Sequence, residues 1–243
     1  MKDRVYRLIV AIGGAFLRVM DVRREVRGVE HVPLEGGAVL AISHFSYLDF
    51  VLAEWAVWRD RRRYTRFMAT KASFDHPVVG RLMSAMGHIP VDRAAGASAY
   101  RFAEAALRRG EVVGVFPETR VSRSFTLLPF KNGAARMAGQ SGCPIVPCVI
   151  WGSHRVMTRT HKTPLLKARH KPVKIIFGEP IPVGPHEDPA LVTERLHHVM
   201  TAMLEEAMDS DVLEPGAWWV PAHRGGSAPT PDKAIELDER KAS

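Results

Sequence analysis

Short apolar runs alternate with longer amphipathic segments along most of this chain. The clearest run, Ala-Val-Leu-Ala-Ile at 38–42, lies between glycine and serine and is typical of a strand buried on both faces. The whole pattern predicts strands at 25–30, 38–42, 66–70, 88–92, 111–116, 145–151 and 173–177, and helices at 5–20, 47–59, 77–86, 98–109, 133–141 and 191–208. This alternation predicts an α/β fold: a single domain with a largely parallel central sheet flanked by helices.

Residues 1–27 stand apart in this pattern, because their helix is apolar in the middle and basic at both ends. Two interpretations are open: a helix packed on the domain, or an interfacial helix in contact with a membrane. The apolar run from Leu8 to Leu17 is shorter than the about 20 residues that a spanning helix needs. No small-residue cleavage site follows it, so we expect no signal peptide.

Residues 28–220 are expected to form the folded domain, and the remaining segment differs from it in composition. Residues 221–243 are rich in Pro, Gly, Ser and charge, so we expect them to be disordered. The two cysteines, Cys143 and Cys148, are expected to be buried thiols, because a secreted disulfide scaffold carries more cysteines. A reducing cytoplasm is therefore the expected compartment.

The net charge of +8 over 243 residues is unevenly distributed. From Leu204 to Ser243, nine acidic and four basic residues give −5, so the preceding 203 residues carry +13. A folded body this basic indicates an anionic partner, which is a nucleic acid, an anionic membrane face or a phosphorylated small molecule.

Candidate chemistry begins directly after the strand at 38–42, with His44 and Asp49 in Ser-His-Phe-Ser-Tyr-Leu-Asp. Ligands gather at the carboxyl ends of parallel strands, where His44 would lie. Asp49 falls in the first turn of the next helix, for which Ser46 is the expected N-cap. A carboxylate bonded to one imidazole nitrogen makes the other a better base. Alternatively, Asp49 only stabilises the helix N-terminus, and His44 is a polar loop residue.

Two other predicted strands also end in charged side chains. Glu118 follows the strand at 111–116, and Thr119, Arg120 and Arg123 come close behind it. Guanidinium and hydroxyl groups at such a position suit a phosphate. Arg93 follows the strand at 88–92. The structural alternatives are a surface loop with a Glu–Arg pair and a strand with a solvated Asp-Arg end.

Together these stretches resemble the glycerophospholipid acyltransferase family, the 1-acylglycerol-3-phosphate acyltransferases and their relatives. His44 and Asp49 match the H-x-x-x-x-D block of that family. The other three blocks are matched by Met-Gly-His-Ile-Pro-Val-Asp-Arg at 86–93, Phe-Pro-Glu at 116–118 and Ile-Val-Pro-Cys-Val-Ile at 145–150. The resemblance covers residues 28 to 180, and four blocks in the right order make it more specific than any one of them.

The chain departs from the family after Phe-Pro-Glu, where Gly-Thr-Arg-Ser is usual. An alignment without a gap places Thr119, Arg120, Val121 and Ser122 there, so that Arg123 would supply the lost charge. An alignment with one deletion keeps the Thr119-Arg120 pair and loses only the glycine. The departure concerns recognition of the acceptor rather than the His–Asp chemistry.

The resemblance implies acyl transfer from a thioester of coenzyme A or acyl carrier protein to a lysophospholipid hydroxyl, with 1-acylglycerol-3-phosphate as the first acceptor to expect. His44 would be the general base and Asp49 would orient it, with no bound cofactor, no metal and no covalent enzyme intermediate. The acceptor's phosphate would be bound or organised by Arg93, Glu118, Thr119, Arg120 and Arg123. Donors to the tetrahedral oxyanion are expected among the backbone amides at 43–47.

A peripheral position on the inner face of the cell membrane is expected as well. The basic body suits anionic lipid, and Trp218 and Trp219 are either membrane-facing or packed on the body. One alternative keeps the chemistry with a glycolipid, a polyol phosphate or another lysolipid as acceptor. A second is binding of nucleic acid or anionic membranes through the basic run at 59–63, without catalysis. No nucleic acid is expected, because no aromatic-basic motif accompanies that run, and metal hydrolysis is disfavoured because no H-E-x-x-H is present.

Overall fold

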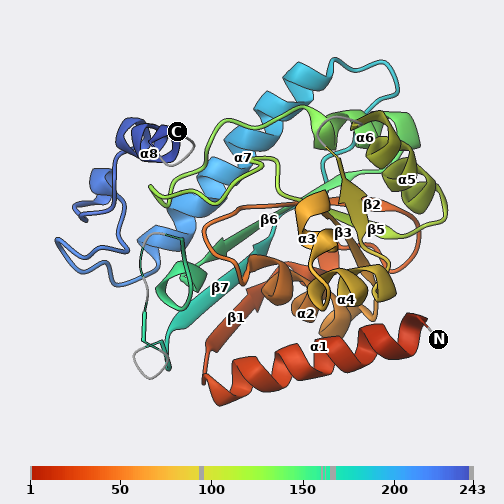
Figure 1. The fold of residues 1–243 in the computed structure, drawn as a ribbon. Coiled ribbons are helices and arrows are strands. Elements are labelled where there is room, and N and C mark those ends of the chain that lie inside the picture. The colour runs from red at the N-terminus through yellow and green to blue at the C-terminus, as the bar shows by residue number, and fades with distance from the viewer. Residues whose placement is uncertain (1, 93–95, 160, 162, 165–167, 241–243) are drawn as a thin grey trace.

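The computed structural model describes residues 2–92, 96–159, 161, 163–164 and 168–240, and its centre is a seven-stranded sheet (Figure 1). The strands are β1 (Arg23–Arg27), β2 (Ala38–Ile42), β3 (Thr65–Thr70), β4 (Ile89–Val91), β5 (Val112–Val115), β6 (Ile145–Trp151) and β7 (Pro172–Phe177). They lie in the order β1-β7-β6-β2-β5-β3-β4. Every pair within these residues is parallel except β6 with β7, so the predicted largely parallel sheet is confirmed.

Helices cover both faces of the sheet, as Figure 1 shows. They are α1 (Lys2–Val19), α2 (Asp49–Arg61), α3 (Lys71–Asp75), α4 (Val79–Ala85), α5 (Gly96–Arg108), α6 (Gly133–Ser141), α7 (Pro189–Asp209) and α8 (Pro231–Glu239), with 3-10 turns η1 (Val29–His31), η2 (Ser153–Arg155) and η3 (Ala222–Arg224). Val39 and Ala41 of β2 pack with α5, α6 and α7, while Leu40 and Ile42 pack with α2. A strand that contributes to two cores must be apolar throughout, which explains the run at 38–42.

Helix α1 is continuous and has two different faces. Its inner face buries Tyr6, Val10 and Leu17. At Gly13 and Gly14 a Cβ would lie 3.2 Å from side chains of α2, so these glycines allow close packing of the two helices. The outer face leaves large apolar side chains exposed, at Leu8, Ile12, Phe16 and Val19. No helix in the described part of the chain is long and apolar enough to cross a membrane.

Most predicted elements lie within a few residues of their observed bounds, with three local differences. The predicted strand at 25–30 begins two residues earlier and ends at Arg27, because Gly28 has a φ of 66° and starts η1. The predicted helix at 77–86 is the shorter α4, and α3 precedes it without having been predicted. The N-cap position of α2 is Leu48 rather than Ser46, whose hydroxyl accepts a hydrogen bond from the Leu48 amide instead.

The C-terminal segment is folded as far as it is described, which corrects the expectation of disorder over 221–243. Pro231 opens α8, and the hydroxyl of Thr230 accepts a hydrogen bond from the Lys233 amide. Ala228 and Ala234 are buried against the body. Composition predicted disorder, but it took no account of the helix cap or of the ion pairs that Asp238 forms with distant arginines.

The prediction of buried cysteines is confirmed, and the structure places the tryptophan pair, for which the sequence left two alternatives open. Cys143 and Cys148 are free, buried thiols, and burial raises the pKa of Cys148 well above its usual value. The tryptophan pair packs on the body instead of facing outward: Trp218 stacks on His161 at 4.0 Å, and Arg155 lies 3.3 Å above the ring of Trp219.

Candidate active site

His44 lies at the carboxyl edge of the sheet, where the three central strands end side by side. It follows β2, whose neighbours are β5 and β6. The imidazole Nδ1 is 3.3 Å from Oδ2 of Asp49, in the first turn of α2. The imidazole also stacks on Phe116 at the end of β5, with 4.0 Å between ring centres and 22° between planes. The ring is therefore fixed at one nitrogen and on one face.

The carboxylate of Asp49 is fully buried and is surrounded by hydrogen-bond donors. Oδ2 accepts from the amides of Phe45 at 2.8 Å and Ser46 at 2.7 Å, and Oδ1 accepts from the Ser153 hydroxyl at 2.6 Å. The carboxylate oxygen Oδ2 also faces Nδ1 of His44, which favours the tautomer with the proton on that nitrogen. The other nitrogen, Nε2, then carries the lone pair that a general base requires.

Four of the backbone amides proposed as oxyanion donors already donate hydrogen bonds to other groups of the protein. The Ser43 amide donates to the Cys148 carbonyl, and the His44 amide donates to Glu118 at 2.8 Å. Those of Phe45 and Ser46 donate to Asp49. The expectation is therefore wrong for residues 43–46, because these amides hold the loop in shape.

Glu118 is a buried support of this loop. Its two carboxylate oxygens accept hydrogen bonds from the amides of His44 and Leu128, at 2.8 and 2.9 Å. Burial raises the pKa of Glu118 to about 8, the Asp49 carboxylate adds to the rise, and the two amides oppose it. Because both oxygens are occupied by the protein's own backbone, Glu118 organises the residues around His44 and does not face a ligand directly.

Three arginines converge near the same loop, and a carboxylate from the C-terminal helix lies among them. Asp238 of α8 is 2.6 Å from Nε of Arg123, 3.0 Å from Arg159 and 3.9 Å from Arg120. The Arg123 side chain is only 5% exposed, whereas Arg120 is 42% exposed. Of the other predicted phosphate-binding residues, Thr119 is exposed at the start of the same loop, and Arg93 lies outside the described residues.

Three residues of this region were not predicted, namely Ser153, Arg159 and Asp238, and Phe116 was noted only as part of the Phe-Pro-Glu block. Phe116 follows β5 directly and Ser153 comes two residues after the end of β6, so the rule that pointed to His44 applies to them too. Arg159 and Asp238 carry no local signal, since neither follows a strand and neither lies in a recognisable motif. Among the described residues, no group of three His, Cys, Asp or Glu side chains could hold a metal ion.

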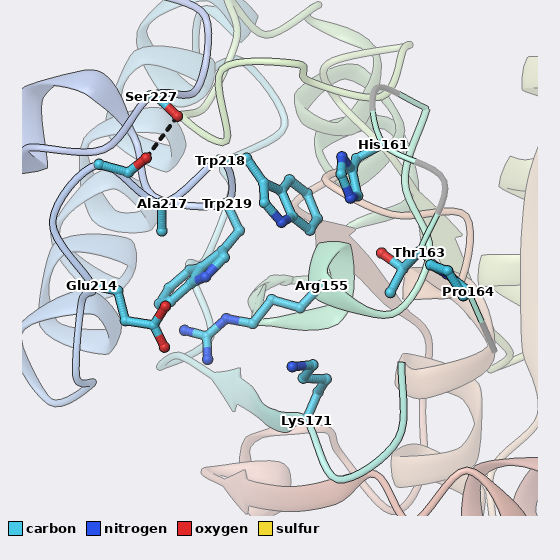
Figure 2. A pocket seen from close by; sticks show the side chains of 11 residues that line it. Arg155, His161, Thr163, Pro164, Lys171, Glu214, Ala217, Trp218, Trp219 and Ser227 are labelled. Carbon is cyan, nitrogen blue, oxygen red and sulfur yellow. Dashed lines mark hydrogen bonds between the residues drawn. The ribbon is translucent and has the colours of Figure 1, made fainter. Parts of the chain in front are cut away.

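A hollow of about 640 Å³ lies beyond β6 at the same edge of the sheet (Figure 2). Arg155, Lys171, Trp218 and Trp219 line it, and Figure 2 shows the Arg155 guanidinium pointing toward Glu214. None of the predicted site residues that the structure describes lines this hollow. It is thus separate from the His44 centre, and we assign it no part in the reaction proposed below.

A family model described as Acyltransferase matches residues 23–151, which is more than half of the chain. This chain belongs to the acyltransferase family. The match begins at β1 and ends at the last residue of β6. It therefore includes His44, Asp49, Glu118 and both predicted loop arginines, whereas Arg159 and α8 lie beyond it.

Individual members of the acyltransferase family agree with this assignment. The chain is 28% identical to a 1-acyl-sn-glycerol-3-phosphate acyltransferase of Limnanthes douglasii over 70% of this chain and 58% of the relative. It is 29% identical to the same-named protein of Bacillus subtilis (strain 168), over 65% and 73%. The chain spans about half the length of the plant relatives that it matches.

The fold also matches a solved acyltransferase structure. This is the 1-acyl-sn-glycerophosphate (LPA) acyltransferase, PlsC, from Thermotoga maritima, with a TM-score of 0.71 and 20% identity. The match covers 88% of this chain and 83% of the other. At this identity it establishes the shared α/β architecture.

The backbone at Thr119 bears on how this loop aligns with the acyltransferase family. Thr119 has a φ of 60°, a left-handed conformation that glycine adopts readily and a β-branched residue rarely does. This favours the alignment without a gap, in which Thr119 stands where the family has glycine. Val121 then takes the position of the family arginine and is buried. The buried guanidinium of this loop belongs to Arg123 instead.

Proposed function

We propose that this chain transfers a fatty acyl group from a thioester of coenzyme A or acyl carrier protein to a hydroxyl of a lysophospholipid, with 1-acylglycerol-3-phosphate as the first acceptor to test. The observation that carries the proposal is the Asp49–His44 pair at the carboxyl edge of the sheet, beside a cluster of arginines. Relatives named 1-acyl-sn-glycerol-3-phosphate acyltransferase support the choice of acceptor.

The reaction needs one base and no covalent enzyme intermediate. Nε2 of His44 takes the proton from the acceptor hydroxyl as its oxygen attacks the thioester carbonyl. The tetrahedral intermediate then expels the thiolate, which takes the proton back from His44. Asp49 holds the ring in place and stabilises the imidazolium that exists between these two steps. The ester and the free thiol are the products, so atoms and charge balance.

Recognition of the acceptor would rest on the arginines. A phosphate monoester carries close to two negative charges and three free oxygens, which suits several guanidinium groups. Arg123 and Arg120 lie in the loop after Glu118, and the Ser122 amide between them donates to the His44 carbonyl at 2.7 Å. An acceptor phosphate bound there would therefore lie close to the base.

The decisive experiment is an acceptor panel with acyl-CoA, read as release of free thiol, with acyl carrier protein thioesters in a parallel series. We expect fast release with 1-acylglycerol-3-phosphate and slow release with monoacylglycerol, which lacks the phosphate. Thioester cleavage that depends on a glycolipid or a polyol phosphate instead would move the acceptor and keep the chemistry. No acceptor-dependent thiol release with any member would contradict the proposal.

We further propose that the protein acts as a peripheral enzyme on the anionic, cytoplasmic face of the cell membrane. The outer face of α1 presents Leu8, Ile12, Phe16 and Val19 at spacings of four, four and three residues, which places them on one side of the helix. Exposed arginines lie near both ends of that helix, at Arg4, Arg7 and Arg18. An apolar stripe with basic ends suits the boundary between acyl chains and anionic headgroups.

This membrane contact can be tested with vesicles of phosphatidylcholine alone and vesicles containing phosphatidylglycerol. We expect binding to the anionic vesicles that weakens with added salt and is lost in Ile12→Asp. Leu191→Asp is the matched control, because Leu191 is similarly exposed, at 62% against 59% for Ile12, but lies on α7. Equal binding of both variants would contradict a role for the α1 stripe.

A further inference from the structure

A set of ion pairs joins the C-terminal helix to the arginines beside His44. Asp238 is the last residue but one of α8, and it forms ion pairs with Arg123 and Arg159 at 2.6 and 3.0 Å and with Arg120 at 3.9 Å. One carboxylate among three guanidinium groups leaves a local excess of two positive charges. The cluster is therefore incompletely neutralised by the protein itself.

Both segments that supply these arginines are anchored to the His44 loop. The Thr158 hydroxyl, next to Arg159, donates to the Phe45 carbonyl at 3.0 Å. The Ser46 hydroxyl donates to the carbonyl of Met157 in the same segment. Together with the Ser122–His44 bond, these contacts place the cluster beside the base. Arg159 is thus positioned as a third guanidinium of the same anion site, although it lies outside the matched family region.

The buried arginine still has an unused donor. The Nη2 atom of Arg123 is buried and finds no hydrogen-bond partner among the described residues. A carboxylate offers two oxygens, whereas a phosphate monoester offers three and nearly twice the charge. The site therefore fits a phosphate better than it fits Asp238.

Helix α8 makes few packing contacts with the body of the protein, so it can detach from the arginines. It has nine residues, of which Ala234 alone is buried, and no other helix or strand packs extensively against it. Figure 1 shows it at one side of the molecule, beyond α7 and outside the sheet layers. The Arg123 and Asp238 side chains are only 5% and 13% exposed, so the carboxylate can leave only when another anion takes its place on the guanidinium groups.

We propose that Asp238 is an internal competitor of the acceptor's phosphate, so that α8 inhibits the enzyme until a phosphate monoester displaces the carboxylate from Arg120, Arg123 and Arg159. This inference rests on the proposed function, because it concerns regulation of the same acceptor site. The apparent affinity for the acceptor is then reduced by the fraction of molecules in which α8 is closed.

The test compares Asp238→Asn with Glu239→Gln in the full chain. Both changes remove one negative charge from α8, but Glu239 is exposed and is not part of the cluster. We expect Asp238→Asn to lower the KM for 1-acylglycerol-3-phosphate about tenfold at unchanged kcat, and Glu239→Gln to change neither. The KM for monoacylglycerol should stay the same in both. Equal KM values in the two variants, or a higher KM in Asp238→Asn, would overturn the proposal.

A second arm measures affinity for inorganic phosphate by titration calorimetry, without any acyl transfer. Asp238→Asn should bind phosphate more tightly than wild type, and Arg159→Met should bind it about tenfold more weakly, with the exposed Arg169→Met as control. Unchanged phosphate affinity in Asp238→Asn would exclude competition at this site. If the wild type acylated no phosphate-bearing acceptor, the proposed function would fail, and these affinities would still decide the role of Asp238.

Discussion

The base and the arginine cluster lie side by side, yet they are assembled in opposite ways. His44, Asp49 and the amides that hold them come from one loop of seven residues, with Ser153 as the one distant donor to Asp49. The arginine cluster joins the loop after β5, the segment after η2 and the last helix. The first is a local structure that the sheet edge imposes, and the second depends on the whole tertiary fold.

This difference predicts that substitutions in the two regions change different kinetic constants. Substitutions in the His44 loop should lower kcat, because the base acts only as the hydroxyl attacks. Substitutions of the arginines in the cluster should raise KM for phosphate-bearing acceptors, since the phosphate stays bound throughout the reaction.

The largest effect is expected for His44→Ala. Loss of the general base should lower kcat by about 10²–10⁴-fold. Thermal unfolding should change little, because the side chain is 17% exposed and mainly contacts Phe116. Thiol release with 1-acylglycerol-3-phosphate and a melting curve check both parts. Near-normal turnover would contradict the assignment of the base, and unfolding of the variant would indicate a structural role.

Asp49→Asn should combine a large loss of turnover with a loss of stability. The amide group cannot accept hydrogen bonds at both of its ends, so a backbone amide or the Ser153 hydroxyl is left unpaired in a fully buried place, at a cost of about 1–3 kcal/mol. The wrong His44 tautomer should lower kcat by about 10²–10⁴-fold. Chemical denaturation and initial rates measure the two effects. A variant with normal kcat but lower stability would show that Asp49 supports only the fold.

Much of the His44 region could be predicted from sequence because its interactions are short-range. The buried strand at 38–42 fixes the position of His44 at the edge of the sheet. Asp49 follows five positions later, close enough in sequence to contact the His44 ring. The predicted oxyanion amides failed for the same local reason, since a loop this tight uses its amides to bind Asp49 and Glu118. The disorder that composition predicted for residues 221–243 was wrong, because the ion pairs of Asp238 depend on arginines more than 75 positions away in the sequence.

Arg123→Met tests the other side of the comparison. Arg123 is the most buried member of the cluster, so its removal should cost one strong charge-assisted contact to the acceptor's phosphate. We expect KM for 1-acylglycerol-3-phosphate to rise about 10- to 100-fold with kcat reduced much less. Steady-state kinetics with and without the phosphate on the acceptor give the measurement. A fall in kcat equal to that of His44→Ala would show that the two regions act as one unit.

His154 lies between the two regions, and its burial predicts how the stability of the fold changes in acid. It follows Ser153, and its ring stacks on Phe125 at 4.3 Å, two residues after Arg123. Burial lowers the pKa of His154 to about 3, and the neighbouring Arg155 lowers it further. The unfolded state then binds more protons than the folded state between pH 6.5 and 3. Stability should therefore fall, as pH drops below 6.5, by about 1.4 kcal/mol per unit for this group.

The measurement is urea unfolding at pH 7.5 and pH 5 for wild type and His154→Phe. The variant should lose less stability on acidification, whatever its stability at pH 7.5. The comparison with wild type is needed because burial also raises the pKa of Glu54 and Glu118 to about 8, and these groups stabilise the fold as pH falls from 8 to 4.5. Equal changes in the two proteins would exclude His154 as an acid-sensitive group.

The smallest effect is expected at Thr119, where the two regions meet. A threonine with a φ of 60° is strained by about 1–2 kcal/mol relative to glycine, but glycine makes the unfolded chain more flexible by about 0.5–1 kcal/mol. Thr119→Gly should therefore raise the free energy of unfolding by up to about 1.5 kcal/mol, measured by denaturation. Thr119→Ala separates the causes, because it removes the hydroxyl but keeps the strain. A gain in glycine alone would support the alignment without a gap and leave Arg123 as the guanidinium that replaces the family arginine. Equal stability of the glycine and alanine variants would favour the alignment with one deletion, in which Arg120 matches the family arginine.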